Sequence, residues 1–197
     1  MKNYLFYVAF IILLVSCASA NRINFYALQS LNPGNINASI DASQSIGVSR
    51  VIVPDYLKNQ GITSLKDNDG QLIIALTHAW AGELDTQITQ VAAQNISQHL
   101  NHTRVWSSPW PHGIRPDIRV QIIIEQLSGI LNQQVELRAK WVVNNVAAKS
   151  ELASGSFTTV VAVDAPSKGS SYGAYTHSMS VAIAKLTETI ALNIAKL

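Results

Sequence analysis

The sequence has little charge and almost no cysteine. Only 13% of its 197 residues are charged, against about 25% in ordinary soluble domains. The 14 Lys and Arg residues are nearly balanced by 12 Asp and Glu, which leaves no excess of basic charge for binding nucleic acid. A single cysteine excludes an internal disulfide and a cysteine-based zinc cluster. The hydrophobic share of 48% excludes a disordered tail and suits one domain with a buried core.

The sequence also lacks an apolar run long enough to span a membrane. The uncharged run Tyr4–Val15 has 12 residues and follows the basic Lys2. A membrane span needs about 20 residues, whereas the apolar part of a signal peptide needs roughly 7–15. We therefore predict an N-terminal export signal, followed by a domain that folds in water.

Two cleavage sites compete at the end of this signal. Ala18–Ala20 is an A-x-A site that would release a soluble protein without cysteine. Leu14–Cys17 resembles a bacterial lipobox, in which cleavage falls between Ser16 and Cys17 and the cysteine then carries the lipid. Only a cysteine can accept the diacylglycerol, because the reaction needs a thiolate nucleophile. The lone cysteine stands where the lipobox requires it, so we favour lipidation at Cys17.

Lipidation divides the chain into three parts. Residues 1–16 are then the signal peptide, residues 17–24 a lipidated tether, and residues 25–197 a periplasmic domain. Each buried CH₂ of an acyl chain contributes about 0.8 kcal/mol, so several chains would form a lasting anchor. Residue 18 is Ala and not Asp, which favours the outer membrane by the usual bacterial sorting pattern.

The remainder predicts a single α+β domain, with an antiparallel sheet packed against two main amphipathic helices. Apolar residues at helical spacing predict a helix of about 18 residues from Glu83 and a second helix at about 171–196. Period-two alternation over 118–125 and 135–143 predicts an antiparallel hairpin that turns near Ser128. Further strands are expected at Phe25–Leu28, Ile46–Val53, Gln71–Thr77 and Phe157–Val163.

Enzyme signatures are mostly absent, and we expect no catalytic residue, no metal and no cofactor. His99 and His102 could share one face of a helix end, and a metal site would then need a third ligand such as His112. His78 could serve as a base, but the sequence offers it no evident partner. Structural roles are favoured for all of these histidines.

Two other groups could carry chemistry. Glu83 and Asp85 lie two residues apart, so on a helix they would point about 200° from each other and would not converge. A helix-dipole role is favoured for both. The tryptophans could form a sugar or lipid platform, but Trp141 falls on the apolar side of its strand and is assigned to the core. For Trp110, which lies between two prolines, the platform and the structural role are more evenly balanced, and the structural role is favoured.

Five short segments resemble those of a known protein family in their order and spacing. The resemblance extends over nearly the whole chain. The segments are Val51–Leu57 (VIVPDYL), His78–Asp85 (HAWAGELD), Ser108–Trp110 (SPW), Pro116–Val120 (PDIRV) and Val135–Trp141 (VELRAKW). On these segments the chain resembles the ABC-type transport auxiliary lipoproteins, the PqiC-like outer-membrane lipoproteins of Gram-negative bacteria. The resemblance implies a non-enzymatic lipoprotein on the periplasmic face of the outer membrane. It also implies a partner, an MCE (mammalian cell entry) protein of an ABC-type intermembrane lipid transport system.

Three functional hypotheses follow. The favoured one is an accessory component of such a transport system, anchored through Cys17, and the number of copies that assemble is left open. The alternative is an outer-membrane assembly factor, such as a lipoprotein that assists lipopolysaccharide insertion or activates peptidoglycan synthases. The third is a periplasmic hydrolase that uses His78 or the pair His99 and His102.

Overall fold

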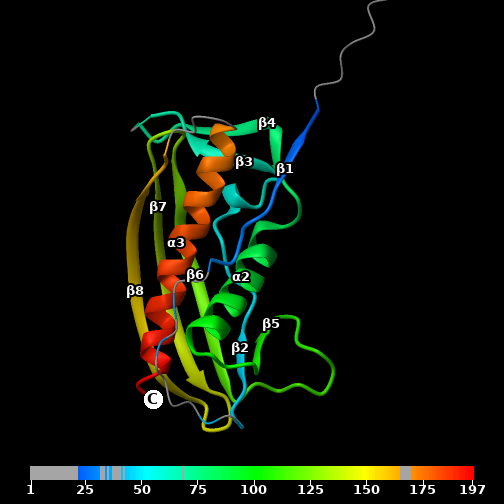
Figure 1. Ribbon diagram of the computed structural model, residues 1–197, viewed down its shortest axis with the longest axis vertical. Coiled ribbons are helices and arrows are strands. Elements are labelled where there is room, and N and C mark those ends of the chain that lie inside the picture. The colour runs from blue at the N-terminus through cyan, green and yellow to red at the C-terminus, as the bar shows by residue number, and fades with distance from the viewer. Residues whose placement is uncertain are drawn as a thin grey trace, which may run out of the picture.

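The computed structural model describes residues 22–31, 34, 36, 41, 43–67, 69–164 and 170–197. These residues form an eight-stranded sheet with two long helices along one of its faces (Figure 1). The strands are β1 (Asn24–Tyr26), β2 (Ile46–Val48), β3 (Gly61–Leu65), β4 (Leu72–Trp80), β5 (Val105–Ser107), β6 (Ile118–Ile130), β7 (Gln134–Asn145) and β8 (Ser150–Ala162). The helices are α2 (Leu84–His99) and α3 (Ser171–Ile194), and η1 (Asp55–Leu57) is a 3₁₀ turn.

Three long antiparallel strands, β6, β7 and β8, form the larger part of the sheet. In β7 the odd-numbered residues from Val135 to Val143 are buried, and in β6 the even-numbered residues from Ile118 to Ile124 are buried. A bulge at Glu125 then shifts β6 by one residue, so that Leu127 faces the core instead. The predicted hairpin is therefore confirmed, with its turn at 131–133, a few residues later than expected.

The sheet is mixed, because short parallel strands join the antiparallel ones. β2 lies parallel to both β5 and β6, and β1 lies parallel to β4. The predicted strand Ile46–Val53 ends at Val48, since the backbone N–H of Val51 bonds the side-chain oxygen of Thr89 on α2 and not a neighbouring strand. Beyond Val48, the backbone N–H of Ser49 donates to Val120 on β6, and Ile52 forms an isolated bridge to Ile123.

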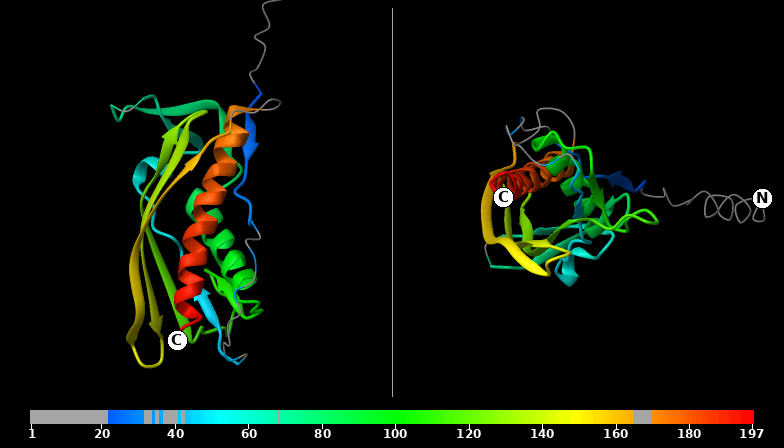
Figure 2. Two further views of the ribbon diagram at one scale, coloured as in Figure 1. Left: turned by 60° about the vertical axis from the view of Figure 1, so that its left-hand side comes forward. Right: turned by 90° about the horizontal axis from the view of Figure 1, so that it is seen from below.

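The two helices bury apolar stripes against the sheet and each other. Ile88 and Ile96 on α2 and Ile183 and Leu186 on α3 are 0% exposed, as expected for helices with one apolar face. Figure 2 shows the sheet curving around the pair. Both helices agree with the sequence prediction, and the α+β class with two main helices in a single domain is confirmed.

The molecule is elongated, and the two ends of the described chain lie at opposite ends of it. Residue 22 and strand β1 lie near the β3–β4 hairpin, whereas the C-terminus lies near the turn that joins β7 to β8 (Figures 1 and 2). Within the described ranges, no helix has both the length and the hydropathy to cross a membrane.

Candidate functional site

The residues expected to carry the lipid anchor lie outside the described residues. These are Ser16 and Cys17, together with the alternative cleavage site at Ala18–Ala20. The structure instead shows where the chain leaves the domain toward them. That point is Arg22, which immediately precedes Ile23 and strand β1.

Strand β1 is held by a group that we call the Tyr26 clasp: Tyr26, His78, Ser170 and Tyr172. The Tyr26 hydroxyl lies 2.8 Å from His78 Nδ1 and donates to Ser170 Oγ over 3.1 Å. The His78 ring stacks on Tyr172 with 4.1 Å between centroids, and burial raises the pKa of the Tyr172 hydroxyl. Ser170 caps α3 by accepting from the backbone N–H of Tyr172. The clasp therefore ties the first strand both to β4 and to the start of α3.

The clasp gives His78 the partner that sequence reasoning did not find. Tyr26 is 52 residues away, and nothing in the local sequence links the two. They meet because β1 pairs in parallel with the end of β4, where Asn24 lies opposite His78 and Tyr26 opposite Trp80. The partners of His78 are aromatic and hydroxyl groups that bridge three elements, so its role is structural.

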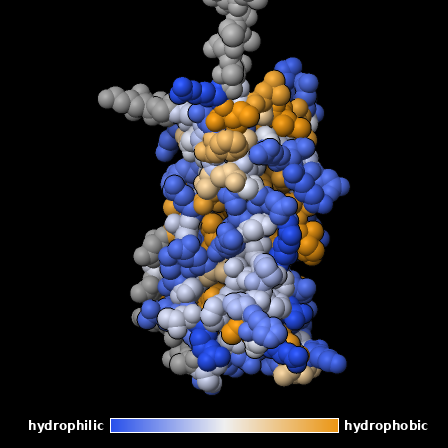
Figure 3. All heavy atoms as spheres, turned by 90° about the vertical axis from the view of Figure 1, so that its right-hand side faces the viewer, coloured by the Kyte–Doolittle hydropathy of each residue, from blue (hydrophilic) through white to orange (hydrophobic). Residues whose placement is uncertain are grey.

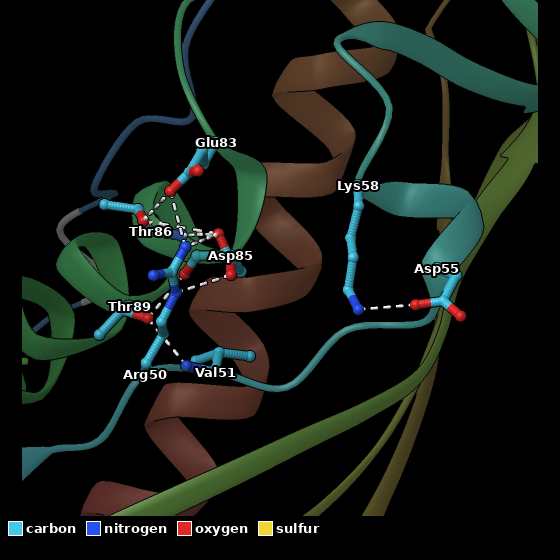
Figure 4. A network of polar contacts seen from close by, with 8 residues as sticks. All are labelled: Arg50, Val51, Asp55, Lys58, Glu83, Asp85, Thr86 and Thr89. Atoms are coloured by element: carbon cyan, nitrogen blue, oxygen red, sulfur yellow. Dashed lines mark hydrogen bonds and ion pairs between the residues drawn. The ribbon is translucent and has the colours of Figure 1, made fainter.

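Arg50 gathers the two acidic residues that begin α2 (Figure 4). Its Nη2 lies 2.6 Å from Glu83 Oε2, and its Nε lies 2.8 Å from Asp85 Oδ2. Hydrogen bonding from Arg50 lowers the pKa of the Asp85 carboxyl, although burial acts in the opposite direction. The expected divergence of Glu83 and Asp85 was wrong for a local reason. Glu83 is the N-cap, with an extended backbone (φ −63°, ψ 126°), so helical geometry does not apply to it.

The same network brings together two of the segments that carry the resemblance. Thr89 on α2 accepts the Val51 N–H at 2.9 Å and donates to the Asp85 carbonyl at 2.6 Å. Lys58, which pairs with Asp55 at 2.6 Å, borders a shallow hollow of about 130 Å³ together with Arg50, Glu83 and Asp85. The segments 51–57 and 78–85 are therefore held against each other.

Two further segments of the resemblance meet around Trp110. The Arg119 guanidinium lies 5.3 Å from the centre of the Trp110 ring, within cation–π range. Gly47 packs against Pro116 so closely that a Cβ on Gly47 would come within 2.3 Å of Pro116 Cγ. Asp117 accepts from both the backbone N–H and the hydroxyl of Ser45, each at 2.7 Å. These bonds lower the pKa of its carboxyl.

Trp110 is accordingly structural, as the sequence favoured. Trp141 is also a core residue, 4% exposed. Its indole covers Gly155 on β8 so closely that a Cβ there would come within 2.9 Å. Trp80 is buried as well, at 2% exposure.

The other histidines singled out in the sequence, His99, His102 and His112, differ in their burial. His99 is 1% exposed, and burial lowers the pKa of its ring. His102 is also buried, with Nε2 lying 2.8 Å from the Gln44 carbonyl oxygen, whereas His112 is exposed in a loop. Among the residues that the structure describes, no three His, Cys, Asp or Glu side chains are placed to hold a metal ion.

An open groove of about 500 Å³ runs between α2 and the loop that follows β5. Gln90, Gln94 and Gln98 line it from α2, Trp106 lines it from β5, and Pro109 and Pro111 line it from the loop. Its lining is mostly uncharged and carries neither a catalytic pair nor a cluster of charges. The groove is suited to contact with a partner surface.

A second surface is strongly apolar, and we call it the apolar end. Figure 3 shows hydrophobic side chains gathered where the N-terminal segment leaves the molecule. On β4, Leu76 is 90% exposed and Ile74 is 47% exposed. The sequence predicts a strand here but not its exposure, because an exposed aliphatic strand and a buried one have the same amino-acid composition. The apolar end consists of Ile23, Phe25, Leu72, Ile73, Ile74 and Leu76.

Comparison with known proteins places this fold among transport lipoproteins. A family model described as the ABC-type transport auxiliary lipoprotein component matches residues 26–191. The chain is 27% identical to the intermembrane transport lipoprotein PqiC of Escherichia coli (strain K12) over 146 residues, 74% of this chain and 75% of that one. The protein of the same name from Shigella flexneri matches equally.

Two solved structures share the fold. One is a crystal structure of an uncharacterized protein, with 21% identity and a TM-score of 0.68 over 88% of this chain and 99% of that one. The other is protein XCC0632 from Xanthomonas campestris, with 14% identity and a TM-score of 0.67 over 88% and 96%. At these identities they establish the shared fold alone.

Proposed function

Because the chain belongs to the ABC-type transport auxiliary lipoprotein family, we propose that it is a lipid-anchored accessory component of an MCE/ABC-type intermembrane lipid transport system. The observation that carries this proposal is the family match from residue 26 to residue 191, nearly the whole described domain. The name of its E. coli relative, an intermembrane transport lipoprotein, supports the same class of function.

The anchor is Cys17. In this proposal, cleavage between Ser16 and Cys17 removes residues 1–16, and the new N-terminus carries acyl chains in the outer membrane. Residues 17–24 then form the tether, and residues 25–197 form the domain on the periplasmic side. The start of the described chain supports this order, since it lies at one end of the elongated molecule, beside strand β1 (Figure 1).

The domain acts by binding, without a chemical step. Its polar clusters around Arg50, Tyr26 and Asp117 join strands, loops and helices to each other. The open groove beside α2 offers a surface to a partner, which we propose to be the periplasmic MCE protein of the same system. A homo-oligomer of the domain at the outer membrane is part of the same proposal.

Cys17→Ser tests the anchor. The variant loses its lipid and moves from the membrane to the soluble periplasmic fraction, as measured by fractionation and by labelling with a radioactive fatty acid. Ser19→Ala is the matched control and stays at the membrane, because it leaves the lipobox intact. Ala18→Asp should keep the acyl chains but change the membrane in which the protein is found. A Cys17→Ser protein that remains fully membrane-bound would refute the anchor.

Cross-linking tests the partner. Mature protein that is cross-linked in intact cells should yield an MCE protein, identified by mass spectrometry. Recovery of a β-barrel or a peptidoglycan synthase instead would favour the alternative function as an assembly factor. Alanine replacement of His78, His99 and His102 that abolished function without unfolding the domain would favour a hydrolase.

A further inference from the structure

We propose that the apolar end is seated on the lipid surface that holds the anchor, so that the domain touches the membrane through protein side chains as well as through acyl chains. The inference rests on the proposed acylation of Cys17. It concerns the six residues Ile23, Phe25, Leu72, Ile73, Ile74 and Leu76, which are between 41% and 90% exposed.

The length of chain outside the structure determines which end faces the membrane. Asn24, the first residue of β1, is seven residues after Cys17. An extended chain covers at most about 3.6 Å per residue, so β1 starts within roughly 25 Å of the anchor. β1 is fixed against β4 by its backbone pairing and by the Tyr26 clasp. The end of the molecule that carries β1 and β4 is therefore held close to the bilayer.

The chemistry of that end suits the boundary between headgroups and acyl chains. From Leu72 to Trp80, β4 contains no Asp, Glu, Lys or Arg. Leu72, Ile74 and Leu76 share one face of the strand, since alternate residues point the same way. The nearby charges are Lys66, Asp67 and Asp69 at the hairpin tip and its flank, and Arg22 beside Ile23, where a cation suits anionic headgroups. A patch of exposed aliphatic side chains on a water-soluble domain marks a protein or membrane contact, and the short tether selects the membrane.

The apolar end also supplies a second attachment. Insertion of apolar side chains adds a hydrophobic contribution to that of the acyl chains. The helices cannot supply it, because their apolar stripes are buried against the sheet and each other.

A single added cysteine tests the proposal in the acylated protein. Acylation blocks the Cys17 thiol, so Leu76→Cys provides one free thiol for an environment-sensitive fluorophore such as NBD. Leu76 is 90% exposed, so its replacement leaves the core untouched. The matched control is Ala147→Cys, an exposed position in the β7–β8 turn at the far end of the molecule. Both proteins are purified with their lipid and reconstituted in phosphatidylethanolamine/phosphatidylglycerol vesicles.

The expected result is a blue-shifted emission at position 76, with quenching of at least twofold by lipids that carry a nitroxide on the acyl chain, and neither effect at position 147. Equal, water-like emission at both positions overturns the proposal. A blue shift at position 76 that depends on protein concentration and is not quenched by lipid also overturns it, because a second copy then covers the patch. Labelling of two thiols per molecule shows instead that Cys17 is not acylated, which is a failure of the proposed function and is counted separately.

Discussion

At the scale of single residues, acidic side chains in this protein serve as acceptors that fasten loops to neighbouring elements. Asp117 receives two hydrogen bonds from Ser45, and Asp85 on α2 receives two from Arg50. In both cases the bonds stabilise the charged carboxylate and lower its pKa. A group whose pKa is depressed in the folded state contributes its stability above its unfolded pKa and loses it on acidification.

Asp117→Asn should therefore destabilise the domain in a pH-dependent way. At pH 7 we expect a loss of about 1 kcal/mol, because two hydrogen bonds to a carboxylate become weaker neutral ones. The contribution of Asp117 is complete above the ordinary carboxyl pKa of 3.8 and disappears as the pH falls through the lower folded value. Urea unfolding of the wild type and the variant between pH 7 and pH 2 should show the two curves converging.

The control for this series is Asp164→Asn, at an exposed position just beyond β8. Its free energy of unfolding should equal that of the wild type at every pH. If the free energies of unfolding of Asp117→Asn and the wild type differed by the same amount down to pH 2, the role of the charge would be contradicted.

At the scale of secondary structure, long periodic segments could be predicted and short ones could not. The alternation in β6 and β7 and the two helical stripes gave the larger part of the domain correctly. β3 and β5 were missed, because Gly61–Leu65 is rich in small polar residues and Val105–Ser107 is three residues long. Such strands form because neighbouring strands offer them backbone partners, which a local pattern does not record.

Contacts between distant residues in the candidate site could not be predicted from local patterns either. The pairing of Glu83 and Asp85 on Arg50 depends on a helix that begins one residue later than the sequence indicated. The meeting of Tyr26 and His78 depends on a parallel pairing between distant strands. By contrast, the core role of Trp141 could be inferred from its place on the apolar side of its strand, and Trp141 is 4% exposed. The burial of His99, at 1% exposure, was not predicted, because its place at the end of a helix indicated only a polar residue.

Tyr26→Phe should loosen β1 without unfolding the domain. The change removes the hydroxyl that contacts His78 and Ser170 and leaves the ring in place. Hydrogen exchange of the amides in β1 and at Ala81, whose N–H donates to the Tyr26 carbonyl, should accelerate several-fold, while the midpoint of global unfolding changes little. Tyr56→Phe is the matched control, because it removes a bond to Leu127 instead and should leave β1 protection unchanged. Unchanged exchange in β1 of Tyr26→Phe would show that the backbone ladder alone holds the strand.

At the scale of the whole molecule, the long axis separates two ends that the proposed anchor would place at different distances from the membrane. The apolar end lies with β1 and β4, and the C-terminus lies with the β7–β8 turn (Figure 2). If the tether and the apolar end orient the domain, its distal end projects into the periplasm, where a partner can reach it.

Energy transfer to a dye in the membrane should report this orientation. A donor placed on acylated protein at position 76 should transfer strongly to a lipid-bound acceptor, and a donor attached after Leu197 should transfer much less. Leu197 is 59% exposed, so attachment there leaves the fold intact. Equal transfer from the two positions would mean that the domain lies flat on the bilayer or tumbles freely on its tether.

The parallel pairing of β1 with β4 also has a mechanical consequence. When a partner pulls on the domain while the acyl chains hold the N-terminus, the force enters along β1. The β1–β4 hydrogen bonds of a parallel ladder are evenly spaced along both strands, so this load shears them together and does not peel them one by one. Under the proposed acylation of Cys17, the first strand is thus a short mechanical coupling between membrane and domain, and the Tyr26 clasp lies at the end of it where the load passes into the fold.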